Sequence, residues 1–152
     1  MNYKLVFSLE ILAFITITFM AVAIEGPQGG LFGRKTFYGL SADAWLFVFT
    51  VPLFLLVIFL VHGFESKLFG TVAIGYFIGL ITNDLLWFVV NPNFGISKFN
   101  SQFTTWLPWI KIGFLEIPSF YISHLFIAIS IWFIFMKNAK RINKFLKRYG
   151  LM

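Results

Sequence analysis

Four ionisable residues lie inside long apolar stretches of the sequence, one in each stretch. They are Glu10, His62, Asp84 and His124, and Asn83 precedes the third of them. An ionisable group in hydrocarbon costs about 2.5–3.5 kcal/mol on insertion scales, so each one requires an explanation. Carboxylates and imidazoles are the groups that form proton relays and cation pathways in membranes. The four residues therefore predict a polar pathway through a membrane.

The depths of these residues can be estimated from the helical rise of about 1.5 Å per residue. From the cytoplasmic edge, His62 is expected about 3 Å deep and Glu10 about 9 Å, while His124 and Asp84 follow at about 15 Å and about 21 Å. If all four face one bundle axis, they form a ladder with rungs about 6 Å apart. Asp84 is then the outer acceptor, His124 the relay near the midplane, and Glu10 with His62 the inner exit.

Structural explanations for the same residues stay open. Glu10 and His62 are close enough to the cytoplasmic edge for their side chains to reach it, or to pair with nearby lysines. Asp84 could pair with His124 and hold two helices together, which would give both residues a purely structural role.

A metal site is the less favoured alternative. Asp84, His124 and Glu10 offer the hard oxygen and imidazole ligands that suit Zn, Fe or Mn. However, the sequence has no E-x-x-H or H-x-x-E-H pair, so no helix supplies two ligands on one face. The chain also has no cysteine, which excludes thiolate sites. We therefore expect no cofactor.

The elements that must position these residues follow from composition. The chain has 152 residues, of which 59% are apolar and 12% charged, whereas soluble domains have about 25% charged residues. Because about 20 helical residues cross the hydrocarbon core, four apolar runs predict an all-α integral membrane protein, an antiparallel four-transmembrane-helix bundle over residues 1–136. The predicted spans are 5–24, 44–63, 69–90 and 114–136.

The distribution of Lys and Arg predicts the orientation of the bundle. With four spans, both termini share one side of the membrane with the 64–68 loop, and that side carries eight Lys and Arg residues against four on the other. Cytoplasmic loops are enriched in these residues, so both termini are expected to be cytoplasmic.

The loop between the last two predicted spans has an unusual composition. Residues 91–113 are rich in Phe and Trp, so they are expected to form an aromatic outer segment that lies on the membrane or folds back over the bundle. Asn91, Glu116 and Trp87 would then lie at the outer mouth.

Small residues repeat every four positions along the third predicted span. Thr71, Gly75, Gly79 and Asn83 form this series. Small residues at this spacing allow close approach of a second helix, either within the bundle or in a homo-oligomer.

The C-terminal residues 137–152 are basic and follow helical spacing. The pattern is typical of an amphipathic helix on anionic lipid, but an ordinary positive-inside tail is the favoured explanation. Nothing beyond charge indicates nucleic acid. The basic residues considered for lipid binding are Lys140, Arg141, Lys144, Lys147 and Arg148.

One stretch resembles a known group of proteins. Residues 83–95, together with Pro108-Trp109 and residues 118–121, are similar to small uncharacterised prokaryotic four-helix integral membrane proteins over about a third of the chain. The resemblance implies a compact four-helix fold in a prokaryotic cytoplasmic membrane and a special outer segment, without a known activity. The group has Glu before the matching Asp and His after Pro-Trp, where this chain has Asn83 and Ile110.

Three functions fit these observations. The leading interpretation is proton or small-cation transport by an oligomer. The second is a membrane enzyme acting on a lipid or isoprenoid, with Asp84, Asn91, Glu116 and His124 beneath the outer segment. The third is an accessory or scaffold subunit in which the intramembrane polar residues only join helices.

Overall fold

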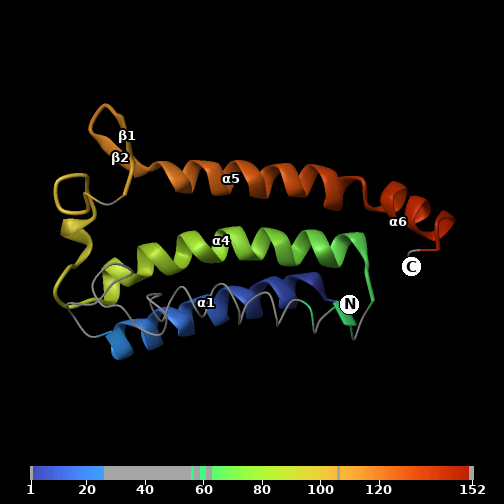
Figure 1. The fold of residues 1–152 in the computed structure, drawn as a ribbon, viewed down its shortest axis with the longest axis horizontal. Coiled ribbons are helices and arrows are strands. Elements are labelled where there is room, and N and C mark those ends of the chain that lie inside the picture. The colour runs from blue at the N-terminus through green and yellow to red at the C-terminus, as the bar shows by residue number, and fades with distance from the viewer. Residues whose placement is uncertain (1, 26–55, 57–58, 61–62, 106, 151–152) are drawn as a thin grey trace, which may run out of the picture.

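The computed structural model describes residues 2–25, 56, 59–60, 63–105 and 107–150, and its long helices lie side by side (Figure 1). Nearly all of the described residues before the outer segment are helical, as their apolar composition predicts. The elements in chain order are α1 (Tyr3–Glu25), α4 (Ser66–Val90), the 3-10 helix η3 (Ile96–Lys98), strands β1 (Trp109–Ile112) and β2 (Leu115–Pro118), α5 (Ser119–Ile131), the π-helix η4 (Trp132–Lys137) and α6 (Ala139–Arg148).

Three helical segments are long and apolar enough to cross a membrane. They are Tyr3–Ala23, Ser66–Val90 and Ser119–Lys137. Each has about the 20 residues that the hydrocarbon core requires. The chain is therefore a mostly helical membrane protein, as composition predicts.

The predicted number of four spans is not confirmed, because the described residues contain three. The predicted second span, 44–63, lies outside the described residues apart from a few positions, of which Leu56, Phe59 and Leu60 are helical. The last span also begins later than the prediction of residue 114, since residues 115–118 form strand β2. Hydropathy alone could not separate an apolar strand from the apolar helix that follows it.

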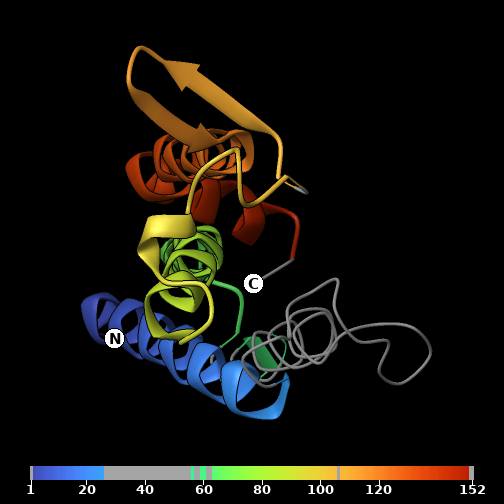
Figure 2. The same cartoon turned by 90° about the vertical axis from the view of Figure 1, so that its left-hand side faces the viewer.

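Helix α4 lies between the other two long helices, with α1 on one side and α5 on the other (Figures 1 and 2). α1 and α4 run in the same direction, and α5 runs back in the opposite direction. The N-terminal end of α1, the start of α4 and helix α6 share one end of the molecule (Figure 1). We call this the tail end, and the opposite end the hairpin end.

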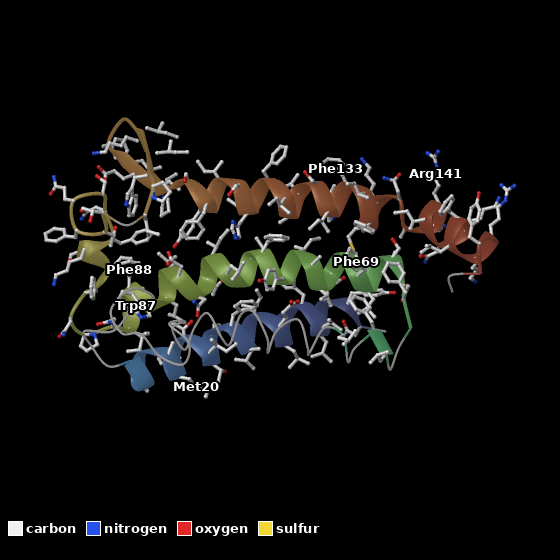
Figure 3. All side chains as sticks on the ribbon, viewed as in Figure 1. Met20, Phe69, Trp87, Phe88, Phe133 and Arg141 are labelled. Atoms are coloured by element: carbon white, nitrogen blue, oxygen red, sulfur yellow. The ribbon has the colours of Figure 1, made fainter. Side chains whose placement is uncertain are left out.

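The tail end is joined by hydrogen bonds at the start of α4. The Ser66 hydroxyl donates to the Phe135 carbonyl over 2.9 Å, and the Ser66 amide donates to Asn143 Oδ1 over 3.1 Å. The ring of Phe69 also lies 4.7 Å from that of Phe135 (Figure 3). A π-helical turn frees main-chain carbonyls from the regular helical pattern, and Ser66 uses one of them to fix α4 against the end of α5.

At the hairpin end, residues 91–105 fold back over α4 and α5. Trp87 and Phe88 close the end of α4 (Figure 3), and the Phe88 ring lies 4.9 Å from Phe99. Phe99 in turn lies 5.1 Å from Trp109 and 5.9 Å from Tyr121 of α5. This chain of ring contacts packs Phe99 against the ends of α4 and α5, whereas Phe103 of the same segment is 55% exposed.

Candidate functional site

Glu10 is the most unusual polar residue of the described part of the chain. It lies in the middle of the contact between α1 and α4, with 5% of its surface exposed. A Cβ atom at Gly75 of α4 would overlap the Glu10 carboxylate, so the carboxylate occupies the space that a side chain at position 75 would take. Among the described residues, neither Glu10 oxygen has a hydrogen-bond partner.

The same contact continues along both helices, and a new pair of contacting residues follows every four positions, about one helical turn. Phe14 packs against Gly79, where a Cβ atom would overlap the ring. One turn further, the Thr18 hydroxyl donates to Asn83 Oδ1 over 2.7 Å and also lies 2.9 Å from the Phe14 carbonyl. Gly75, Gly79 and Asn83 of the predicted small-residue series therefore contact α1 of the same chain. Thr71, the fourth member, lies 3.8 Å from Met136 Sδ of η4 instead.

Asp84 lies on a different face of α4 from Gly75. Nine residues separate the two positions, which corresponds to two and a half turns and about 13 Å along the helix axis. Asp84 faces α5, where the hydroxyl of Tyr121 donates to Asp84 Oδ2 over 2.7 Å. Tyr121 is 8% exposed, so this hydrogen bond is shielded inside the contact between the two helices.

His124 lies one turn beyond Tyr121, on the α4 side of α5. Its Nδ1 atom lies 2.7 Å from the Phe120 carbonyl of its own helix. Its ring packs edge-on against Phe77 of α4 at 5.3 Å. The hydrogen-bond partner of Asp84 is thus Tyr121 rather than His124 in the part of the chain that the structure describes.

The predicted ladder is therefore divided between two helix contacts. Glu10 occupies the α1–α4 contact, whereas Asp84 and His124 occupy the α4–α5 contact. Asn83 faces α1 while its neighbour Asp84 faces α5, so these two residues connect the contacts. His62 lies outside the described residues.

The residues predicted at the outer mouth have structural partners. Trp87 is 8% exposed, and its ring lies 4.9 Å from that of Phe94. Asn91 is 1% exposed, and its Oδ1 accepts a hydrogen bond from the Asn93 amide over 3.0 Å. Its Nδ2 atom has no partner among the described residues.

Glu116 joins the hairpin to the outer segment. It forms an ion pair of 2.9 Å with Lys111 and accepts a hydrogen bond of 2.7 Å from the Ser101 amide. The Ser101 amide, followed by Lys111, lowers the pKa of Glu116 to about 2, because both stabilise the charged carboxylate. Its oxygens are thus engaged with the outer segment and Lys111.

A polar cluster at the tail end was not predicted from the sequence. The Tyr3 hydroxyl donates to Glu65 Oε1, and the ammonium of Lys67 lies 5.9 Å from the centre of the Tyr3 ring. Lys67 is one of the nearby lysines that the sequence offers as a partner of His62 or Glu10. Tyr3 is the signal that could have been used, because a Tyr at the end of a span commonly holds a polar partner at the interface.

The basic residues of α6 are exposed to solvent along the helix, and Arg141 points away from the bundle (Figure 3). Asn143 holds the opposite face of α6 to the start of α4. Within the residues that the structure describes, no three His, Cys, Asp or Glu side chains gather as metal ligands. Comparison with known proteins found no matching family model, curated protein or solved structure.

Proposed function

We propose that this protein conducts protons or small cations through the membrane, and that Glu10 is the group that takes up the ion. The observation that carries the proposal is the buried Glu10 carboxylate without a hydrogen-bond partner among the described residues. A carboxylate in such a place must be neutralised by a proton or a cation, since leaving it charged and unpaired is costly. A residue that only joined helices would have a partner, as Thr18 and Asp84 do.

The surroundings of Glu10 support entry from the tail end. Glu10 lies seven residues after the start of α1, about 10 Å along the helix. On α4, Thr71 lies one turn nearer the tail end than Gly75, but its hydroxyl donates to the Lys67 carbonyl and lies 3.8 Å from Met136 Sδ of η4. The cluster of Tyr3, Glu65 and Lys67 at the tail end would therefore provide the polar entry on the side of the carboxylate.

The next step toward the hairpin end is apolar. Phe14 is 1% exposed and fills the contact at Gly79, so an ion at Glu10 cannot move on without displacement of this ring. Beyond Phe14 come the Thr18–Asn83 hydrogen bond and then Asp84 with Tyr121. Phe14 would act as a gate, and Asp84 would be the acceptor toward the hairpin end, with His124 beside it.

In this proposal the bundle has four spans, with both termini cytoplasmic. The tail end carries eight Lys and Arg residues, and the described part of the hairpin end carries Lys98 and Lys111. The positive-inside rule supports a cytoplasmic tail end, because this side is richer in Lys and Arg. A single chain of 152 residues leaves only a narrow path for an ion, so a homo-oligomer is part of the proposal. Because α1 covers Gly75 and Gly79, an oligomer formed through the third predicted span would use another face of α4.

Flux into liposomes tests the proposal. Purified protein is reconstituted, and proton and potassium flux are measured for wild type, Glu10→Gln, Asp84→Asn and Glu116→Gln. We expect flux to be lost in Glu10→Gln and reduced in Asp84→Asn, because both remove an acceptor. Glu116→Gln changes a carboxylate outside the pathway and should retain flux. Wild-type flux that persists in Glu10→Gln contradicts the proposal.

A second experiment reports on Glu10 without transport. A hydrophobic carbodiimide reacts with a protonated carboxyl group inside a membrane and forms a stable adduct, which mass spectrometry locates. We expect modification at Glu10 that inhibits flux and slows as the pH rises. Absence of an adduct at Glu10 over the whole pH range would argue against a carboxyl that exchanges protons.

An accessory subunit is the second candidate, because α5 is little covered. Among its residues only Tyr121 and Ala128 are buried, so most of this helix is available for lipid or another membrane protein. Recovery of a larger complex in mild detergent, retained after Glu10→Gln, would favour this function over transport.

A further inference from the structure

The hairpin of β1 and β2 has two different faces. Its register pairs Ile110 with Ile117, Lys111 with Glu116 and Ile112 with Leu115. Because side chains alternate between the faces of a strand, one face carries the ion pair. The other face is entirely apolar, and its members are Ile110, Ile112, Leu115 and Ile117.

The polar face of the hairpin is turned toward the outer segment. Glu116 on this face accepts a hydrogen bond from the Ser101 amide. At the base of the same face, Trp109 donates from Nε1 to the Thr104 carbonyl over 2.9 Å. The apolar face therefore turns away from residues 91–108.

The apolar face and the tip are uncovered. Ile112 is 59% exposed, Leu115 is 48% exposed, and Phe114 at the tip is fully exposed. Gly113 has φ of +61°, which is the conformation that a two-residue hairpin loop requires and which favours glycine. This turn places Phe114 at the end of the hairpin.

The position of the hairpin indicates what covers this surface. β2 ends at Pro118, and α5 begins at the next residue. The span Ser119–Lys137 is about 28 Å long, close to the thickness of the hydrocarbon core of about 30 Å. Ser119 thus lies at one edge of the core, and the hairpin projects sideways from that edge, away from the bundle (Figures 1 and 2).

We infer that the hairpin is a membrane-interface anchor whose apolar face and Phe114 insert among the lipids at the hairpin end. Elements that lie in the membrane interface typically carry Phe and other apolar side chains on one face and charged residues on the opposite face. The ion pair of Lys111 and Glu116 stays on the side of water and headgroups. This inference does not depend on ion transport, since the hairpin has no contact with Glu10 among the described residues.

The absence of cysteine in the chain allows a direct test. Single variants Phe114→Cys and Ile112→Cys carry an environment-sensitive fluorophore in the full-length protein, reconstituted in phosphatidylethanolamine–phosphatidylglycerol vesicles. Ser97→Cys, at an exposed position of the outer segment, is the matched control. Quenchers are iodide present on both sides of the vesicle, a lipid labelled near its headgroup, and a lipid labelled near its chain end.

We expect labels at 112 and 114 to be quenched most by the lipid labelled near its headgroup and little by iodide. The label at 97 should show the reverse. Strong iodide quenching at 112 and 114 would overturn the inference in favour of a hairpin in water. Protection from all quenchers would also overturn it, because a second copy or another protein would then cover the hairpin. The result is independent of flux, so it is distinguishable from failure of the Glu10 proposal.

Discussion

Thr18 Oγ1 lies 2.7 Å from Asn83 Oδ1, and this hydrogen bond fixes the register of two parallel membrane helices. Thr18 is fully buried and Asn83 is 8% exposed, so neither group reaches water. The bond lies at the same height along α4 as Asp84. It belongs to the α1–α4 contact, whereas Asp84 belongs to the α4–α5 contact. Glu10, two turns away on α1, occupies the same contact without such a partner among the described residues.

The Thr18–Asn83 bond should contribute a measurable coupling energy. Hydrogen bonds between membrane helices contribute about 0.6 kcal/mol on average and at most about 1.7 kcal/mol. We expect a double-mutant cycle of Thr18→Val and Asn83→Leu, measured by unfolding in mixed detergent, to give a coupling within this range. Thr16→Val is the control, because exposed Thr16 donates to the Leu12 carbonyl of its own helix and has no other hydrogen bond among the described residues. A coupling of zero would show that packing alone sets the register.

Enlargement of Gly79 should separate α1 from α4. A Cβ atom at Gly79 overlaps the Phe14 ring, and Phe14 is 1% exposed, so the ring must displace its neighbours to make room. We expect Gly79→Leu to lower the free energy of unfolding by at least about 1–3 kcal/mol, the usual range for overpacking. Val89→Leu adds volume on the same helix at a position that is 57% exposed and should be neutral. Equal effects of the two variants would contradict the packing described here.

Removal of the Tyr121 hydroxyl should destabilise the contact of α4 and α5. Tyr121→Phe keeps the buried ring but leaves the half-buried Asp84 without its hydroxyl donor. Loss of one partner of a buried polar group costs about 1–3 kcal/mol, so we expect a lower free energy of unfolding. Tyr149→Phe, at a position 60% exposed in the tail, is the matched control. A neutral Tyr121→Phe would show that Asp84 finds another partner.

Acid should release the outer segment from the hairpin. The pKa of Glu116 is lowered from 4.5 to about 2, so its charged form stabilises the folded state fully above pH 4.5. This contribution decreases as the pH falls below 4.5 and is lost below about 2. A nitroxide label at exposed Gln102, placed through Gln102→Cys, should become more mobile over this interval. Glu116→Gln should show high mobility already at pH 7; a label that is immobile there would contradict this role of Glu116.

The sequence was sufficient to predict the membrane class and three of the helices. The bounds of α1 and α4 differ from the predicted spans by a few residues, because both are framed by breakers and charges. Hairpin 109–118 was not predicted, since its apolar run continues into α5 without a change in hydropathy. The sequence distinguishes the strands from the helix only by the alternation of Lys111 and Glu116 with isoleucines. Gly113 was the available signal for the turn between the strands.

The arrangement of the polar residues could not be predicted from depth alone. A position along a helix gives height, whereas the direction that a side chain faces depends on which helices are neighbours. Gly75 and Asp84 face opposite sides of α4 because nine residues make two and a half turns. That relationship could have been calculated from the sequence. The placement of α1 on one side and α5 on the other could not.

Glu10 should lower stability while it supports function. Its buried carboxylate has no hydrogen bond within the part of the chain that the structure describes, and an unsatisfied buried polar group costs about 1–3 kcal/mol. Glu10→Met retains a similar length without the polar atoms, so we expect a higher free energy of unfolding together with loss of flux. Leu9→Met, at a position 53% exposed on the same helix, should change neither quantity. A gain in stability with loss of flux is the expected signature of a residue retained for function; a loss of stability in Glu10→Met would instead indicate that the carboxylate has a structural partner.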